Sequence, residues 1–326
     1  MPPHSEVMSG QPLQQGRTRA PAYLRRALCG LMAGMCLACV AGCVSLKHYA
    51  ADRVGDALAA SGSGFSSDDD PELIRAAAPF SLKLMESVLE ERPRHTGLLT
   101  AAAGSFTQYA YAFVQQDADE LEQHDVAGAF ALRARARALY LRARDYGLRA
   151  LETHHPGFAG ELTVAAPTPF SLQRGDATAI YWTAVAWAAS ISLAKDSPDA
   201  IAELPRVDRL VRSLEALDPE YDRGSLDTFL ISYEMGRPGV RPPVAEAREH
   251  FERALRLTGG QRAGPYVAFA ENVCVASQDR RQFLATLQQA LAIDPSVRRE
   301  WRLENLIMQR RARWLIGQAD QLFLEQ

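Results

Sequence analysis

Five segments of the chain end in the same way, and this repeated ending constrains the fold more than any other feature. Each has a small–large pair of apolar residues and then, within five residues, a proline or a glycine pair that stops a helix. The pairs and their breakers are Val88-Leu89 with Pro93, Ala150-Leu151 with Pro156, Ala216-Leu217 with Pro219, Ala254-Leu255 with Gly259-Gly260, and Ala290-Leu291 with Pro295. No alternating run of β-branched residues and no Asn-Gly or Asp-Gly turn indicates strands. The sequence therefore predicts an all-α fold.

The intervals between these pairs indicate repetition. They are 62, 66, 38 and 36 residues long, so the last two approach the 34-residue period of tetratricopeptide repeats and the first two approach twice that period. Segments 247–255 and 283–295 both resemble the second helix of such a repeat. A helix pair cannot bury its apolar face alone, so neighbouring pairs stack. We expect a degenerate tetratricopeptide-like solenoid or bundle; the alternative is an ordinary helical bundle, because Ala-Leu pairs are common there too.

The first of these helices also has a recognisable beginning. Asp70 precedes Pro71, which gives an N-cap followed by a proline in the first turn. One helix face is then marked by apolar residues at three- and four-residue spacing: Ile74, Ala78, Leu82, Met85 and Leu89. Ser197-Pro198 and Asp294-Pro295 repeat the same pattern, so we expect helices to begin there as well.

The N-terminal region has the features of a lipoprotein leader. Arg25 and Arg26 precede an uncharged apolar stretch, 27–40, and Val40-Ala41-Gly42-Cys43 follows. A basic region, a short apolar region and a small-residue cleavage site make a secretion signal, and Val-Ala-Gly-Cys matches the lipobox, in which the cysteine thiol accepts a diacylglyceryl group. The stretch is too short for a membrane span, which needs about 20 apolar residues. We expect Cys43 to carry fatty acyl chains such as palmitate; an apolar leader with an incidental cysteine is the alternative.

This leader sets the expected domain organisation and location. We predict a signal peptide over 1–42, a lipidated cysteine with an N-terminal helix and linker over 43–70, and a helical repeat domain over 71–326. Val44, rather than an aspartate, follows the cysteine, and by the Gram-negative sorting tendency this favours the outer membrane. The expected protein is therefore anchored by lipid and faces the periplasm. The leader is long ahead of Arg25, so Met8 or a later codon is a candidate for the true start.

The net charge argues against a nucleic-acid partner, and the cysteine content argues against a disulfide within the chain. Without residues 1–42, which hold four arginines and one glutamate, 32 basic and 38 acidic side chains remain, a formal charge of −6. No basic patch with interleaved aromatic residues is present, so we expect no nucleic-acid partner. Cys274 is the only cysteine after Cys43 and shares a helix face with Val267 and Ala270, which predicts a buried thiol.

Two segments are too apolar for surface helices. Residues 106–114 place aromatic side chains on several helix faces, and residues 177–194 contain no charged side chain. The second segment just reaches the length of a membrane span, but its threonines, serines and many alanines favour a helix buried in the core. Between the two, glycines and prolines predict a long irregular loop over 158–175.

Residue patterns for catalysis are missing from the sequence. No Gly-rich phosphate loop, His-Glu-x-x-His string or Gly-x-Ser-x-Gly elbow occurs. His154 and His155 are adjacent, so we expect them to point in different directions at a helix end rather than to share a metal. Asp145 is expected to pair with Arg149, one helical turn away. We therefore expect no catalytic residue, no metal site, no cofactor and no enzymatic activity.

Several strings of the sequence together resemble one family. They are the glutamine- and tyrosine-rich segment 106–119 and the segments 137–149, 155–158 and 180–189. These strings are similar to the TatT lipoproteins, the T components that accompany tripartite ATP-independent periplasmic (TRAP) transporters. With the lipobox and the terminal repeats, the resemblance covers most of residues 43–295. It implies a degenerate tetratricopeptide-like fold, a homotrimer and an apolar cleft or pore in each protomer. It also implies association with a periplasmic solute-binding protein that takes organic or hydrophobic ligands.

The two apolar segments supply the candidate residues for lining such a cleft. They are Phe106, Gln108, Tyr109, Tyr111, Phe113, Gln116, Tyr181, Trp182 and Trp187. Tyrosine joins an apolar ring to a hydroxyl group, which suits a cavity that is apolar yet wet at one end; the alternative is that these side chains simply fill the core. We expect a non-enzymatic transport accessory that binds a solute-binding protein and a small hydrophobic or organic-acid ligand. The alternatives are an envelope scaffold that binds proteins only and, third, an envelope hydrolase.

Overall fold

The computed structural model describes residues 49–60, 65–163, 171–237 and 243–324, and every regular element in these ranges is a helix. A helix over residues 49–60 comes first. The helices after it are α3 (Pro71–Glu91), α4 (Thr96–Ala110), η1 (Tyr111–Gln115), α5 (Gln116–Leu121), α6 (Val126–His154), α7 (Phe158–Glu161), η2 (Arg174–Asp176), α8 (Ala177–Ser192), α9 (Pro198–Ile201), α10 (Leu204–Leu217), η3 (Tyr221–Arg223), α11 (Ser225–Gly236), α12 (Val244–Thr258), α13 (Ala263–Phe269), η4 (Ala270–Cys274), α14 (Arg280–Ala292), η5 (Arg299–Trp301), α15 (Arg302–Gly317) and α16 (Ala319–Leu322). The predicted all-α class is confirmed. Cys43 and the leader lie outside the described residues, and residues 51–326 form one compact unit.

The predicted helix ends are confirmed at all five apolar pairs. Helices α3, α6, α10, α12 and α14 each end within three residues of the leucine of their pair. The start of α3 is also as expected, since Asp70 Oδ1 accepts hydrogen bonds from the backbone N–H groups of Glu72 and Leu73, both at 3.0 Å. That these helices form tetratricopeptide-like units stays a prediction.

The expected start at Asp294-Pro295 is wrong. There the Asp294 carboxylate accepts a hydrogen bond from the backbone N–H of Ser296 at 2.8 Å and closes a turn, and the next helical turn begins only at Arg299. An aspartate two residues before an N–H group stabilises an isolated turn as well as it caps a helix. The pattern alone therefore did not distinguish the two.

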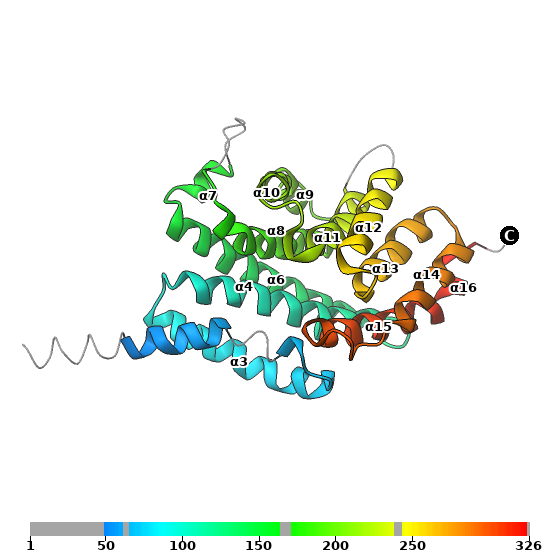
Figure 1. Cartoon of the computed structure of the whole chain (residues 1–326), viewed down its shortest axis with the longest axis horizontal. Helices are drawn as coiled ribbons and strands as arrows, with labels where there is room; N and C mark the ends of the chain where they lie inside the picture. The colour runs from blue at the N-terminus through cyan, green and yellow to red at the C-terminus, as the bar shows by residue number, and fades with distance from the viewer. Residues whose placement is uncertain (1–48, 61–64, 164–170, 238–242, 325–326) are drawn as a thin grey trace, which may run out of the picture. The chain divides into compact units, whose positions relative to one another are not determined.

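The centre of the unit is a layer of three long helices, α4, α6 and α8, which pack against one another (Figure 1). Helix α8 carries the uncharged segment, and most of its residues are buried, as predicted for a core helix. Among the described residues, none of the helices has the length and apolar character needed to cross a bilayer. The backbones of α6 and α8 approach closely because Gly147 faces Thr183, where a Cβ atom would lie 2.0 Å from the hydroxyl oxygen.

A π-helical turn, η1, follows α4 directly and continues into α5. A π-turn inserts an extra residue into the helix, so the faces before and after it fall out of phase. Phe106 and Val114 are both buried in the core, while Tyr109 and Tyr111 are half-buried. The spread of aromatic residues around this segment, which is unusual for a regular helix, thus has a structural cause. A second π-turn, η4, follows α13 and ends at Cys274, whose thiol is buried as predicted; burial raises its pKa to about 12.

Three local predictions around α6 need correction. Asp145 pairs with its neighbour Arg144, at 2.8 Å, and Arg149 instead donates to the backbone carbonyl of Pro93. His154 and His155 do not diverge, because α6 ends between them and the backbone turns. Both rings reach the buried carboxylate of Asp176, His154 Nδ1 at 3.1 Å and His155 Nε2 at 2.9 Å. The segment predicted as an irregular loop contains the short helix α7, which buries Phe158 in the core.

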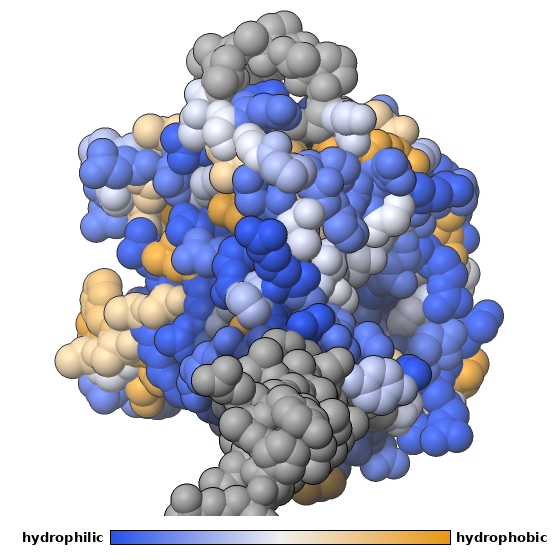
Figure 2. Space-filling model, turned by 90° about the vertical axis from the view of Figure 1, so that its left-hand side faces the viewer, coloured by the Kyte–Doolittle hydropathy of each residue, from blue (hydrophilic) through white to orange (hydrophobic). Residues whose placement is uncertain are grey.

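The face shown in Figure 2 is largely polar, and its apolar residues occur in separate groups. Exposed large apolar side chains do follow one face of α3, at Leu73, Phe80 and Leu84. A shorter pair, Val126 and Phe130, lies on the first turns of α6. Exposed apolar side chains that follow one helix face can contact a partner, whereas isolated ones need no explanation.

Candidate ligand pocket

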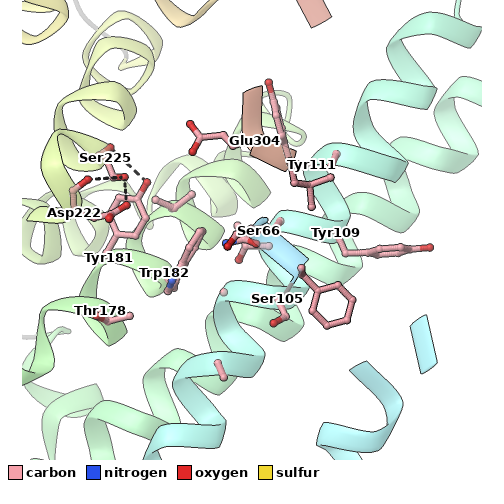
Figure 3. Close-up of a pocket in the computed structure, with 18 of the residues that line it drawn as sticks. Ser66, Ser105, Tyr109, Tyr111, Thr178, Tyr181, Trp182, Asp222, Ser225 and Glu304 are labelled. Atoms are coloured by element: carbon pink, nitrogen blue, oxygen red, sulfur yellow. Dashed lines mark hydrogen bonds between the residues drawn. The ribbon is translucent and has the colours of Figure 1, made fainter. Parts of the chain in front are cut away.

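A cavity of about 680 Å³ lies within the unit, between the central helices and the C-terminal ones. Its wall is formed by residues 58–59 and 65–66, α3, α4, η1 and α8, and by η3, α11, the start of α13, η5 and α15. Figure 3 shows lining side chains of α4, η1, α8, η3, α11 and α15 around this space. A volume of this size falls in the range of about 300–1,000 Å³ that is usual for small-molecule sites.

The wall supplied by α4 is made of small residues up to Ser105, with the larger Gln108 and Tyr109 at its end. Gly97, Thr100, Ala101, Gly104 and Ser105 line the cavity at helical spacing. Gly104 faces the indole of Trp182 on α8, and a Cβ atom there would lie 2.9 Å from the indole nitrogen. Small side chains on α4 therefore leave the space that the cavity occupies.

The facing wall, supplied by α8 and η3, is aromatic. The rings of Tyr181 and Trp182 are 5.0 Å apart in an edge-to-face arrangement, and the rings of Tyr181 and Tyr221 are 4.8 Å apart. Burial raises the pKa of Tyr181 well above its ordinary value and raises the pKa of Tyr221 to about 12. Both phenols therefore stay neutral, and this wall offers hydroxyl groups rather than charges.

The polar end of the pocket is organised around Arg262, which is buried at the start of α13. Its Nε donates to both oxygens of Glu304, at 3.2 and 3.1 Å, and its Nη2 donates to Oε2 at 2.6 Å. Its Nη1 donates to the Ser225 hydroxyl at 2.8 Å and to the Asp222 carbonyl at 3.0 Å. Burial alone lowers the pKa of this guanidinium, but the charge and hydrogen bonds of Glu304 outweigh it, so the pKa lies above its ordinary value.

The turn beside this arginine has a strained backbone. Asp222 and Arg223 have positive φ angles, 43° and 51°, ahead of Gly224. Such a conformation costs of order 1 kcal/mol for a residue with a Cβ atom and persists only where its surroundings hold it. Here the Arg262 side chain binds the Asp222 carbonyl, and the Ser225 hydroxyl donates to the Asp222 carboxylate at 2.5 Å (Figure 3).

Six of the nine residues singled out from the sequence lie in the wall of this pocket: Gln108, Tyr109, Tyr111, Phe113, Tyr181 and Trp182. Phe106, Gln116 and Trp187 do not. The Phe106 ring packs in the core against Tyr146, with centroids 5.7 Å apart, and Gln116 is buried at the start of α5. The Trp187 indole donates to Glu203 at 2.7 Å, below the guanidinium of Arg144, on a different face of α8.

Sequence reasoning missed the whole polar end. Asp222, Ser225, Arg262, Trp301 and Glu304 come from three separate stretches of the chain, 222–225, 262 and 301–304, and none belongs to a recognisable motif. One weak signal was available: Arg262 follows the glycine pair that ends α12, a position where a buried side chain can enter from a turn.

No group of acidic, histidine or cysteine side chains suited to a metal ion occurs in the part of the chain that the structure describes. The pair His154–His155 with Asp176 is accounted for by the cap of η2, since Asp176 also accepts a hydrogen bond from the backbone N–H of Gln173 at 2.8 Å. The pocket thus offers binding groups, and its charged side chains form ion pairs with one another.

Comparison with known proteins gives two matches. The family model described as the TRAP transporter T-component matches residues 67–323. A protein of Treponema pallidum (strain Nichols), described as an uncharacterized protein, is 29% identical over 321 residues, which cover 91% of this chain and 98% of the relative.

Proposed function

Because this chain belongs to the T-component family of TRAP transporters, we propose that it is a non-enzymatic accessory that holds a small hydrophobic or organic molecule for the transporter. The observation that carries this proposal is the pocket of about 680 Å³, with one wall of small residues, one aromatic wall and one polar end. A chain that served only as a scaffold would have no need for such a space, because protein interiors are normally filled to the density of organic crystals.

The proposed protein partner is a periplasmic TRAP solute-binding protein, and helix α3 is the proposed contact. One face of α3 contributes Ile74, Leu82 and Met85 to the pocket wall. Another face exposes Leu73, Phe80 and Leu84. A partner that docks on this exposed face therefore contacts the same helix that lines the ligand space.

The proposed location is the periplasmic side of a membrane, with the outer membrane favoured and Cys43 as the acylated anchor. Support comes from the basic and apolar leader, from the sequence Val40-Ala41-Gly42-Cys43 and from Val44 after it. One acyl chain binds a bilayer only marginally, while two or more anchor a protein stably. The homotrimer that the family resemblance implies is part of the same proposal.

Native mass spectrometry tests the ligand proposal. The protein, released from its membrane in mild detergent, should retain a small organic molecule after gentle desolvation. The pocket-filling variant Ser105→Phe should lose it, whereas Ser192→Phe, the same change at an exposed position on α8, should keep it. An empty wild-type protein, and equal spectra for the two variants, would favour the scaffold function instead.

Co-purification tests the partner. Phe80 and Phe130 are matched in residue type and exposure, 75% and 64%, but lie on α3 and α6. Phe80→Glu should abolish recovery of the solute-binding protein and Phe130→Glu should not. Equal recovery with both variants would contradict docking on α3.

A further inference from the structure

The charged residues of the pocket lie together at one end. They are Asp222, Arg223, Arg262, Glu300 and Glu304. The lining contributed by α3, α4, η1 and α8 contains no charged side chain. A ligand that fills the pocket therefore meets uncharged groups along its length and ionic groups at one tip only.

The buried cation at this tip is already neutralised within the protein. Arg262 holds Glu304 in a bidentate pair and uses Nη1 for Ser225 and the Asp222 carbonyl, which leaves one N–H group of the five without a hydrogen bond in this arrangement. A ligand carboxylate would have to displace Glu304 to gain a bidentate contact. It would then have to replace the three hydrogen bonds that Glu304 accepts from this guanidinium, and such charge-assisted, bidentate pairs are among the strong hydrogen bonds of proteins.

The neighbouring cations are occupied in the same way. Arg223 pairs with Glu300 at 3.4 Å, and Arg298, which lies just outside the lining, approaches the same carboxylate at 3.8 Å. The guanidinium groups of Arg223, Arg262 and Arg298 all lie over the Trp301 ring, at 4.6, 5.4 and 5.7 Å. The lining holds three carboxylates, with Asp222, and two guanidinium groups, and Arg298 beside it supplies the third cation. Each charged group at this end is therefore already paired with an opposite charge of the protein.

We infer that the pocket takes a ligand with an apolar body and an uncharged polar head, such as an alcohol, an amide or an ester, and discriminates against free carboxylates and amines. This inference rests on the proposed ligand-binding function and narrows its ligand class. The hydroxyl groups of Tyr181, Tyr221 and Thr178 can exchange neutral hydrogen bonds with such a head, while the apolar body lies along α4.

The test is a titration of the full-length protein with a series of ten-carbon compounds that differ only in the head: 1-decanol, decanamide, methyl decanoate, decanoate and decylamine. Tryptophan fluorescence reports binding, since Trp182 and Trp301 line the pocket. We expect the three uncharged compounds to bind at least about tenfold more tightly than the two ions, because a charge moved from water into this site meets cations and carboxylates that are already paired with one another. Equal or tighter binding of decanoate than of methyl decanoate to the wild-type protein would overturn the inference.

A charge-removing variant gives an independent measurement. Glu304→Gln frees Arg262 for an external anion. The affinity for decanoate should therefore be at least about tenfold higher than that of the wild type, while the affinity for 1-decanol should change little. Glu252→Gln removes an exposed carboxylate from α12 and should change neither compound. Unchanged discrimination in a folded Glu304→Gln variant would contradict the role given to the Arg262–Glu304 pair. If none of the five compounds binds, and Ser105→Phe does not change the molecule retained in the native mass spectrum, the proposed ligand-binding function itself fails. If the compounds bind but the charged ones bind more tightly than the uncharged ones, only the inference about the ligand class is refuted.

Discussion

Replacing Gly147 with alanine should destabilise the protein, although the same substitution normally favours a helix. The added Cβ would lie 2.0 Å from Thr183 Oγ1, 3.0 Å from its Cβ and 3.3 Å from its Cα, against about 3.5–4.0 Å for relaxed contacts between carbon atoms. Thr183 is fully buried, and its hydroxyl donates to the Ala179 carbonyl at 2.5 Å, so the side chain has no free direction in which to rotate. The third contact is with backbone, which means that α6 and α8 themselves must separate.

The expected magnitude follows from two opposing terms. Overpacking a filled core costs about 1–3 kcal/mol, and contact with backbone at the crossing of two long helices places this case in the upper half of that range. Replacing glycine by alanine inside a helix returns about 1 kcal/mol. The net loss in the free energy of unfolding should therefore be about 1–2 kcal/mol.

Urea denaturation followed by far-ultraviolet circular dichroism measures this loss. Gly317→Ala is the matched control, because nothing lies within 4 Å of the position of its Cβ at the end of α15, and its stability should stay equal or rise slightly. In the double variant Gly147→Ala/Thr183→Ala, the loss should be smaller than the sum of the single losses, since each change relieves the other. A Gly147→Ala protein as stable as the wild type would refute the close approach of α6 and α8.

Three further perturbations have defined outcomes. In Gly104→Ala the added methyl group meets the Trp182 side chain, which borders the cavity, so Trp182 should move into the pocket. The unfolding midpoint should change little, while the tryptophan emission should shift and the ligand affinity should fall. Unchanged emission would contradict the contact. Burial raises the pKa of Asp117, but hydrogen bonds from Arg75 and Arg310 outweigh it and leave the pKa below 3.8. The unfolded chain then takes up the proton first, so stability should fall as the pH drops below about 4, and Asp117→Asn should flatten this decline in unfolding midpoints measured between pH 3 and 6. Cys43→Ser should shift the protein from the membrane fraction to a soluble or unprocessed form, and persistence of acylated protein would refute the proposed anchor.

The helices could be predicted from the sequence because their signals are local. An apolar pair near a helix end is followed by a breaker at all five places, and the cap of α3 depends on Asp70 and the two residues after Pro71. The uncharged segment of α8 is buried for the reason its composition suggests. Local signals failed where the backbone leaves the helix, as at Asp294 and at the end of α6, since the direction of a side chain there depends on the turn that follows.

The pocket was only half predictable, for a physical reason. Tyr181 and Trp182 stand out because they are large side chains in an alanine-rich helix. Two adjacent aromatic residues point in different directions from a helix, so they offer more aromatic surface than one packing face needs. Arg262 and Glu304 are 42 residues apart, and each alone is an ordinary charged residue of a helical protein. Their pairing exists only in the folded chain, and so does the neutral character of the site.

The cavity itself arises from the unequal division of side-chain volume between facing helices. A helical core is usually filled because large residues on one helix meet small ones on the next. Here α4 offers small residues from Gly97 to Ser105, yet Trp182 fills only the place opposite Gly104, where the glycine lets the indole lie against the backbone. The remaining volume stays open because the far wall is held away by the ion pair of Arg262 with Glu304 and by the strained turn at Asp222. Both features oppose collapse of the space, so the pocket is sustained by the same groups that neutralise its polar end.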